Sequence, residues 1–431
     1  MATAPPCGSS IESVGPLRLT IPTHFAISSP HRVGLGGLPM REPGYRGRSG
    51  RRSISTAFIV LIAVALSGCA SRPGPELLTP VAALPGDKPV QIYVATSRER
   101  QSPSQNVFTA NRAPALNFAK FAVSVPPNHR PGTIELPTDP PDPKTSFAIV
   151  DQAVLTEADF RKAVAPKGGG RKRHKVFVFV HGFNNNFQES LFRMTQLQAD
   201  AKVDGVPILF AWPSQAQVIG YEADKAAAIG SRDQLAALLT MLTASPEVGE
   251  ILLVAHSMGC MLTMETLRQL RAEGKNQVIA RLNRVVLAAP DIDAQVFRGQ
   301  VQTLGPLKLP LLVLVSKDDG ALRFSTLLGG TGAVRAGALD VDNPIVQEAA
   351  LKAKVQVVDI SRLASHDDLH HDQFVSVAVL YTRLQHNAAP YRNTAGTFVF
   401  NPDGATMVQP VNVGSQALAV RDRPDFPHAA E

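Results

Sequence analysis

The chain has 431 residues, of which 44% are hydrophobic and 18% charged, enough for one large domain or two smaller ones. Its formal net charge of +7 would suggest a nucleic-acid partner, but the excess positive charge lies in one part of the chain. Residues 1–68 contain seven Arg, no Lys and two Glu, so 36 basic and 34 acidic side chains remain in the rest of the chain. This near balance, without a clustered basic-aromatic motif, argues against a nucleic-acid-binding protein.

The first 68 residues have the pattern of an export leader. Four Arg between residues 46 and 52 precede the apolar run Ala57–Leu66, which is too short to span a bilayer. Residues 1–39 are rich in Pro, Gly and Ser and fit no region of a signal peptide. We therefore expect residues 1–68 to be a leader and translation to begin at Met40.

The tetrapeptide Leu66-Ser67-Gly68-Cys69 resembles the lipobox of bacterial lipoproteins, in which the Cys thiol is acylated after export. The resemblance implies a lipid on Cys69. Because Ala70 rather than Asp follows, it also implies sorting to the outer membrane of a Gram-negative cell, facing the periplasm. Residues 69–87, which include four Pro, are expected to be a tether that holds the following domain away from the membrane.

Residues 88–385 alternate between apolar strands and amphipathic helices. The first expected elements are strands at Val90–Thr96, Phe118–Val125 and Thr133–Leu136 and a helix at Thr156–Val164. The later expected strands are Val176–Val180, Ile208–Trp212, Ile251–Ala255, Val285–Ala289, Leu311–Ser316 and Val355–Ile360, with helices at Glu189–Lys202, Ala223–Thr243, Met258–Glu273 and Ala321–Leu328. This alternation predicts an α/β fold with a mostly parallel sheet and helices on both faces. Ligands then gather at the carboxyl ends of the strands.

Ser257 lies between the buried strand Ile251–Ala255 and the helix that follows it. A Ser on so sharp a strand-to-helix turn projects its hydroxyl above the sheet edge, and the residues two before and two after it must be small. Ala255 and Gly259 meet that requirement. Ser257 is therefore the predicted nucleophile; the alternative is a helix-capping Ser.

A His-Gly turn, His181-Gly182, follows the strand Val176–Val180 at the same edge. Such a turn aims backbone N–H groups at the space above the nucleophile, and the amide after the nucleophile supplies a second donor. We therefore expect the N–H groups of Phe183 and Met258 to form an oxyanion hole. The side chains of residues 184–186, all Asn, are expected to cap the next helix.

Four Asp residues at strand ends compete for the role of the acid. Asp319, followed by Gly320, comes after the strand Leu311–Ser316 and is preferred over Asp318. Asp291 and Asp293 follow the preceding strand and are the alternates, since an acid from that strand occurs in some hydrolases; otherwise they are loop and cap residues.

The base must come last in the order Ser, Asp, His. The segment after Val355–Ile360 contains His366, His370 and His371, and His371 is preferred because it precedes the apolar run Phe374–Leu380, expected to be a helix. A zinc site is the competing interpretation of this His and Asp cluster. We expect no metal and no cofactor.

Six segments together resemble a bacterial α/β-hydrolase family long described as of unknown function and regarded as esterase/lipase-like. The resemblance covers roughly residues 88–385 and implies the α/β-hydrolase fold, with Asp319 as the acid and His371 as the base. The segments are His181-Gly-Phe-Asn184, Phe210-Ala-Trp-Pro-Ser214, Ala255-His-Ser-Met-Gly259, Leu287-Ala-Ala-Pro-Asp-Ile-Asp293, Ser316-Lys-Asp-Asp-Gly-Ala-Leu322 and His371-Asp-Gln-Phe374.

The predicted function is a membrane-anchored serine hydrolase that cleaves small-molecule or lipid carboxylic esters. An acyltransferase with the same three residues and a non-catalytic binding lipoprotein are the alternatives. Segments after Trp212, at Gln295–Lys308 and at Gly329–Asn343 are candidates for a cap over the substrate pocket. Residues 386–431 are expected to be a partly disordered tail with one hairpin at Thr397–Val408.

Overall fold

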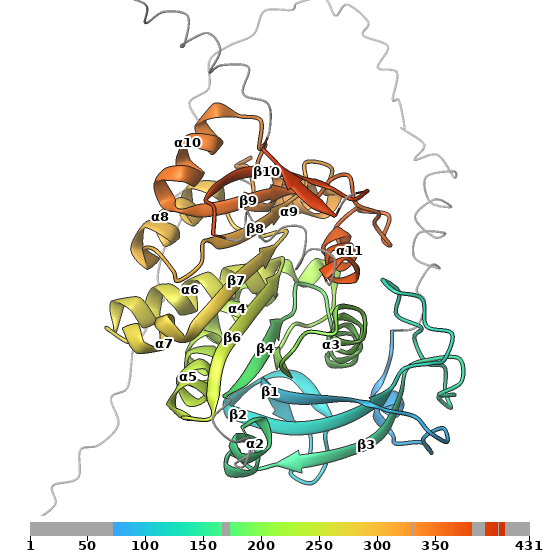
Figure 1. Ribbon diagram of the computed structural model, residues 1–431. Helices are drawn as coiled ribbons and strands as arrows, with labels where there is room; N and C mark the ends of the chain where they lie inside the picture. Colours follow the sequence, from blue (N-terminus) through green and yellow to red (C-terminus); the bar gives the residue numbers. More distant parts are fainter. Residues whose placement is uncertain (1–71, 166–172, 329–331, 382–392, 404, 410–431) are drawn as a thin grey trace, which may run out of the picture. The chain divides into compact units, whose positions relative to one another are not determined.

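A mixed sheet of 11 strands forms the centre of the computed structural model (Figure 1). The structure describes residues 72–165, 173–328, 332–381, 393–403 and 405–409, so the predicted leader and Cys69 lie outside the described residues. The strands run in the order β11-β10-β9-β8-β7-β6-β4-β5-β1-β2-β3. Their bounds are β1 Val90–Arg100, β2 Phe108–Ser124, β3 Ala148–Leu155, β4 His174–Val180, β5 Val206–Ala211, β6 Val248–His256, β7 Leu282–Ala288, β8 Leu311–Val315, β9 Val355–Asp359, β10 Gly396–Asn401 and β11 Thr406–Val408.

Helices connect most of these strands. The α-helices are α2 Glu157–Val164, α3 Phe187–Ala201, α4 Tyr221–Gly230, α5 Arg232–Ala244, α6 Met258–Ala272, α7 Asn276–Arg281, α8 Ala294–Leu304, α9 Gly320–Leu328, α10 Pro344–Ala353 and α11 Gln373–Val379. Short 3-10 helices lie at η1 Pro75–Leu78, η2 Val218–Gly220 and η3 Ala336–Ala338. No helix among the described residues is both long enough and apolar enough to cross a membrane.

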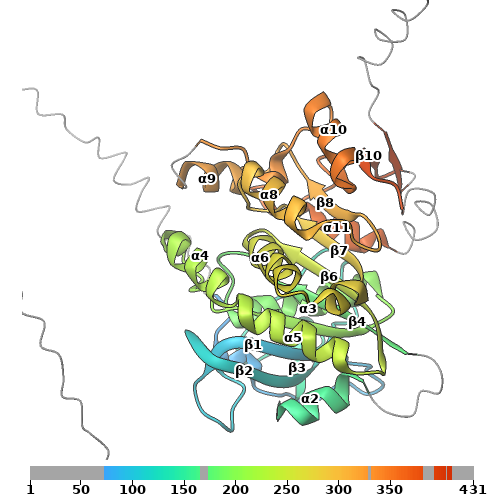
Figure 2. The same ribbon diagram turned by 90° about the vertical axis from the view of Figure 1, so that its left-hand side faces the viewer.

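The parallel part of the sheet, β1-β5-β4-β6-β7-β8-β9-β10, is buried on both faces. Helices α3 and α11 pack together on one face, whereas α4, α5 and α8 pack with α6 on the other (Figures 1 and 2). Each face carries its own apolar cluster, with Phe192 of α3 in one and Leu262 of α6 in the other. The continuous apolar strands follow from this two-sided burial, because neither face of the strand is left to water.

The chain reverses direction across the sheet next to β4, which places two strand ends together. After β4 the chain crosses to β5 on one side, then returns past β4 to β6 on the other. β4 and β6 pair in parallel, with Val180 opposite Ala255. The turns that follow them, at His181 and at Ser257, therefore lie side by side at a topological switch point, where ligands bind in folds of this kind.

The predicted α/β fold with a mostly parallel sheet is confirmed, and the six strands expected between residues 176 and 360 are all present. The long helix expected at Ala223–Thr243 is instead two helices, α4 and α5. They separate at Gly230-Ser231, where the Ser231 hydroxyl donates to the carbonyl of Ala227 and bonds the hydroxyl of Ser97. Gly is a poor helix former, and this Ser competes for backbone hydrogen bonds.

Two expectations were wrong because tertiary packing overrides local pattern. Thr133–Leu136 is not a strand; β3 at Ala148–Leu155 takes the place beside β2. Gln295–Lys308, a candidate cap, is largely α8, which packs on α6 and covers the sheet. Phe297, Val301 and Leu304 recur at helical spacing and are buried, so this segment belongs to the fold and not to a lid.

The two ends of the domain also differ from expectation. The tether is packed against the domain from residue 72 onward: Leu77 and Leu78 are buried, and the Val81 N–H donates to the Ile149 carbonyl. The predicted hairpin is present as β10 and β11, but β10 pairs in parallel with β9. The sheet therefore continues beyond residue 385, the expected end of the domain.

Candidate active site

Ser257 occupies a strained turn between β6 and α6. Its backbone has φ 52° and ψ −121°, a conformation that non-glycine residues rarely adopt and that is found at functional turns. A Cβ at Gly259 would lie 2.3 Å from the carbonyl oxygen of His181 and 2.8 Å from that of Val180. The helix can therefore approach β4 this closely only with Gly at position 259, which is the packing that the small flanking residues predicted.

His181 fixes the turn that faces Ser257. Its ring stacks on Trp212 with centroids 4.9 Å apart, and the Trp212 indole N–H donates to the His181 carbonyl at 2.8 Å. An Nδ1–H tautomer donates to the Gly182 carbonyl at 2.9 Å and accepts the Trp212 backbone N–H on Nε2 at 3.1 Å. Burial, and then the charge of Arg98, lower the pKa of His181 to about 3. The His181 ring is therefore neutral, and together with the fully buried Trp212 it holds this turn in place.

The two expected oxyanion donors lie beside Ser257. A Cβ at Gly182 would be 3.0 Å from the Cβ of Ser257, so the turn that carries Phe183 adjoins the Ser257 side chain. Met258 is the first residue of α6, where the N–H has no partner within the helix. In the described part of the chain neither the Phe183 nor the Met258 N–H takes part in a hydrogen bond. Both donors are free to bind an oxygen atom.

Asp319 and His371 are in direct contact. Asp319 follows β8 and immediately precedes α9; its Oδ1 accepts the Leu322 N–H at 2.9 Å, and its Oδ2 lies 2.7 Å from His371 Nδ1. The carboxylate is almost wholly buried, with 1% of its side chain exposed against 16% for His371. Burial alone would disfavour the charged imidazole, but the hydrogen bond and the charge of Asp319 outweigh it and raise the pKa of His371 above 6.5.

A polar network holds the loop that carries His371. The His371 N–H donates to Asp367 at 2.8 Å, and the Ser365 hydroxyl lies within 2.9 Å of both Asp367 and Asp372. Arg193 of α3 lies 3.9 Å from Asp372, which ties the loop to the helix behind it. The base candidate is thus held by its own loop and by a second element, as a rigid site requires.

His256 is a site neighbour that the sequence did not single out. Its ring stacks on Phe374 with centroids 4.4 Å apart and lies 4.6 Å from the ring of His371. Burial, and then the positive potential of His371, hold the pKa of His256 well below 6.5. His256 is therefore neutral and packs between the turn at Ser257 and the loop that carries His371. The position between Ala255 and Ser257 accepts many residue types, so nothing in the pattern marked it.

The alternate site residues lie elsewhere. Asp318 is exposed, as are His366 and His370. Asp293 caps α8 by accepting the N–H groups of Gln295 and Val296, and Asp291 lies in a separate buried cluster with Tyr221, Ser325 and Arg335. Among the described residues no group of three or more His, Cys, Asp or Glu side chains is arranged to hold a metal ion.

Ser257 and His371 are neighbours without a direct hydrogen bond in the described part of the chain. They are joined through His256, which precedes Ser257 and whose Nε2 lies 3.3 Å from the His371 carbonyl oxygen. Hydrogen bonds between a nucleophile and its base are often long before substrate binds. Proton transfer between the Ser257 hydroxyl and the His371 imidazole would need the two side chains to come within hydrogen-bonding distance, closer than they lie in this structure.

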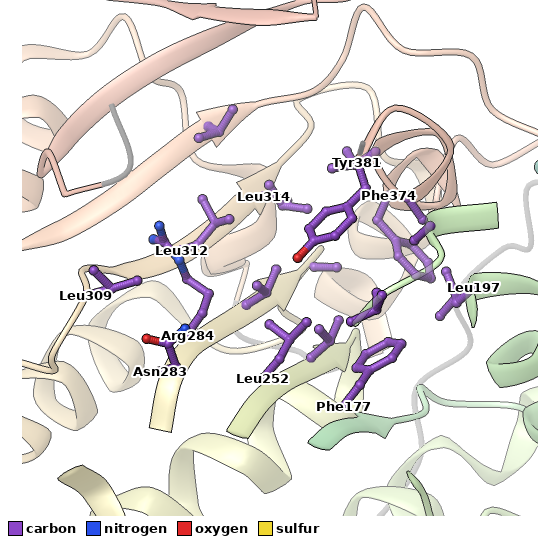
Figure 3. Close-up of a pocket in the computed structure, with 18 of the residues that line it drawn as sticks. Phe177, Leu197, Leu252, Asn283, Arg284, Leu309, Leu312, Leu314, Phe374 and Tyr381 are labelled. Atoms are coloured by element: carbon purple, nitrogen blue, oxygen red, sulfur yellow. The ribbon is translucent and has the colours of Figure 1, made fainter. Parts of the chain in front are cut away.

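A cavity of about 630 Å³ lies below the site, on the face of the sheet next to α3 and α11 (Figure 3). Its walls are mainly apolar and include Phe177, Leu252, Leu312 and Tyr381. It runs toward the amino ends of the strands, away from Ser257. Its end toward the site is lined by Phe374, which stacks on His256, and by Ala288, whose carbonyl accepts the Ser257 N–H.

Residues 156–387 match the family described as alpha/beta hydrolase of unknown function (DUF900). No curated protein matches the chain. Among solved structures, it is similar to a brefeldin A esterase, described as a bacterial homologue of human hormone-sensitive lipase, at 12% identity over 84% of this chain and 82% of that one, with a TM-score of 0.28. It is also similar to an esterase from the fungus Rhizomucor miehei, at 16% identity over 59% of this chain and 74% of that one, with a TM-score of 0.22. A hydrolase from Oleispira antarctica is similar at 11% identity over 54% of this chain and 82% of that one, with a TM-score of 0.21. The family match spans more than half of the chain, and the protein therefore belongs to this family of α/β hydrolases of unknown function.

Proposed function

We propose that the protein is a serine hydrolase of carboxylic esters, with Ser257 as nucleophile, His371 as base and Asp319 as the acid that orients the base. The observation that carries the proposal is the 2.7 Å contact between Asp319 and His371 at the sheet edge that also presents Ser257 on a strained turn. Nucleophile, base and orienting carboxylate follow one another along the chain in the order expected of this fold.

The reaction runs in two halves. His371 Nε2 accepts the proton of the Ser257 hydroxyl as Oγ attacks the ester carbonyl carbon, and the carbonyl oxygen becomes an oxyanion held by the Phe183 and Met258 N–H groups. The C–O bond to the alcohol breaks, and His371 returns the proton to the leaving alkoxide. Water, deprotonated by His371, then attacks the acyl-enzyme and releases the acid.

A covalent probe tests the nucleophile directly. We expect a fluorophosphonate to label the wild-type protein on Ser257 and p-nitrophenyl esters to be hydrolysed, whereas Ser257→Ala should lose both. Ser124→Ala, at a buried Ser of β2 beside the amino end of β1 and thus at the opposite edge of the sheet, is the matched control and should label normally. Labelling of Ser257→Ala, or inertness of the wild type toward every probe and ester, would overturn the proposal. Adding an alcohol acceptor separates hydrolysis from acyl transfer.

We also propose that the protein is anchored by a lipid on Cys69 and faces the periplasm from the outer membrane. The lipobox-like Leu66-Ser67-Gly68-Cys69 supports this, together with the Arg-rich and apolar stretch before it. Mass spectrometry should find a mature chain that begins at an acylated Cys69, and Cys69→Ser should be recovered in the soluble fraction. A soluble wild-type protein that begins at another residue would rule out the anchor.

A further inference from the structure

Arg72, three residues after Cys69, is hydrogen-bonded to the turn beside Ser257. One guanidinium nitrogen donates to the Asn184 carbonyl and to Glu189 Oε2, both at 2.9 Å, and another donates to Asn184 Oδ1 at 2.8 Å. The next carbonyl, that of Pro73, accepts from the Asn186 amide at 2.8 Å. The start of the described chain is thus fastened to the turn that carries the Phe183 oxyanion donor, 112 residues away in sequence.

This attachment limits how far the site can lie from a lipid on Cys69. Three residues of fully extended chain span at most about 11 Å. Asn184 directly follows Phe183, so the anchor point and the oxyanion turn are neighbours. A bilayer that holds the lipid of Cys69 would therefore meet the molecule at the carboxyl edge of the sheet, where Ser257 lies.

Exposed apolar side chains gather at the same edge. We call Val218, Ile219, Phe324, Leu327 and Leu328 the apolar rim; all five are exposed, Ile219 to 94% and Leu327 to 77%. The three residues from α9 recur at i, i+3 and i+4 and form one outward stripe, opposite the buried Leu322 and Ser325. Large apolar side chains grouped on a surface mark a contact site.

The two parts of the apolar rim are held together by one buried carboxylate. Tyr221, two residues after Ile219, donates its hydroxyl to Asp291 at 2.9 Å, and Ser325 of α9 donates to the same carboxylate at 2.7 Å. The ring of Tyr221 also lies edge-on to that of Phe183, with centroids 5.3 Å apart. η2, α9 and the oxyanion turn are therefore one continuous region, and α9 and α4 lie at the same margin of the molecule in Figure 2.

We propose that the apolar rim is a membrane-docking surface: Arg72 holds the site edge against the bilayer that carries the Cys69 lipid, and the rim inserts into it. The proposal rests on the ester hydrolysis and the lipidation proposed above, and it makes the substrate an ester presented by the membrane. Charged groups beside the rim are of both signs, Lys317 and Arg323 against Asp318 and Glu222. Apolar insertion, and not attraction to anionic headgroups, is therefore the recognition chemistry.

The contact can be measured on the full-length lipoprotein reconstituted into phosphatidylcholine vesicles. Ile219→Cys and Leu327→Cys, labelled with an environment-sensitive fluorophore, should shift to the emission of an apolar environment and be quenched by a lipid-borne quencher. Leu351→Cys is the matched control: Leu351 is exposed on α10, near the amino end of β9 and thus at the opposite edge. Cys260 is buried and should stay unlabelled.

Activity supplies a second readout. Ile219→Glu and Leu327→Glu should each lower kcat/KM on a vesicle-borne ester by about tenfold or more and leave hydrolysis of soluble p-nitrophenyl acetate unchanged, because only membrane contact is lost. Leu351→Glu should alter neither rate. Arg72→Ala should move the labels at residues 219 and 327 back toward the emission of water, whereas Arg268→Ala, at an Arg of similar exposure, should not.

The results that would overturn the docking surface differ from those that would overturn the hydrolase. Labels at 219 and 327 that stay in water, equal shifts at 351, binding only to vesicles with phosphatidylglycerol, or burial of residue 219 in a concentration-dependent dimer would each overturn the docking surface. An unacylated Cys69 would do the same. Fluorophosphonate labelling of Ser257 is independent: lipid contact without labelling refutes the hydrolase, and labelling without lipid contact refutes the docking surface alone.

Discussion

Two buried carboxylates follow neighbouring strands, and their partners give them different roles. Asp319 after β8 holds one imidazole, that of His371, at 2.7 Å. Asp291 after β7 accepts hydrogen bonds from Tyr221 and Ser325 and pairs with the buried Arg335 at 3.3 Å. The first carboxylate faces a group that can exchange a proton near neutral pH, whereas the second faces a permanent cation.

The comparison teaches that position at a strand end does not identify a catalytic acid. The Asp291 cluster is satisfied on every side and connects β7, α4, α9 and the loop at Arg335, which suits a brace beneath the site. Within the described residues, the Nε2 of His371, the imidazole that Asp319 contacts, makes no hydrogen bond. Only the Asp319–His371 arrangement can take a proton from a nucleophile, so the two carboxylates should respond differently to the same experiments.

The largest expected effect is on the base. His371→Ala should lower ester turnover by on the order of a millionfold, because Ser257 then has no proton acceptor. The double variant Ser257→Ala/His371→Ala should be little worse than either single variant, since the residues act as a unit. His370→Ala, at the exposed neighbour, is the control and should be mild. A dead His370→Ala with an active His371→Ala would move the base by one residue.

The two carboxylates themselves should separate activity from stability. Asp319→Ala should reduce turnover by about ten-thousandfold with a modest loss of stability. Asp291→Asn should lower the free energy of unfolding by about 3–5 kcal/mol, because it leaves Arg335 buried without its counter-charge, and should retain turnover per folded molecule. Denaturant unfolding and active-site titration measure both quantities. The reverse pattern would place the acid on the earlier strand.

The smallest expected effect is a shift in pH dependence. His371 must be neutral to act as a base, so kcat/KM should rise with pH through a midpoint above 6.5, where Asp319 raises the pKa. Asp319→Asn removes the negative charge and should lower that midpoint in the residual activity; Asp291→Asn removes a weaker contribution of the same sign and should lower it less. The same raised pKa stabilises the folded protein below pH 6.5, and this contribution is lost as pH rises through the folded-state value. A midpoint insensitive to Asp319→Asn would show that another group controls the profile.

Local sequence was sufficient for the fold and for the strained turn at Ser257. Buried parallel strands have to be continuously apolar, so β4 to β9 were visible one at a time. The turn at Ser257 was visible because its small neighbours are a local steric requirement, met at Gly259 by the carbonyls of β4. The sequence also ranked Asp319 and His371 first, although their catalytic roles are still a prediction.

Contacts between distant segments were decided only by the tertiary structure. Four Asp residues stand at strand ends, and which of them reaches His371 depends on how the loops after β7, β8 and β9 fold over the edge. Arg72 is hydrogen-bonded to Asn184, 112 residues away, so the segment expected to be a free tether is packed beside the site. Such pairings are set by packing geometry and leave no periodic trace in the sequence, because a hydrogen bond needs only two polar groups brought together.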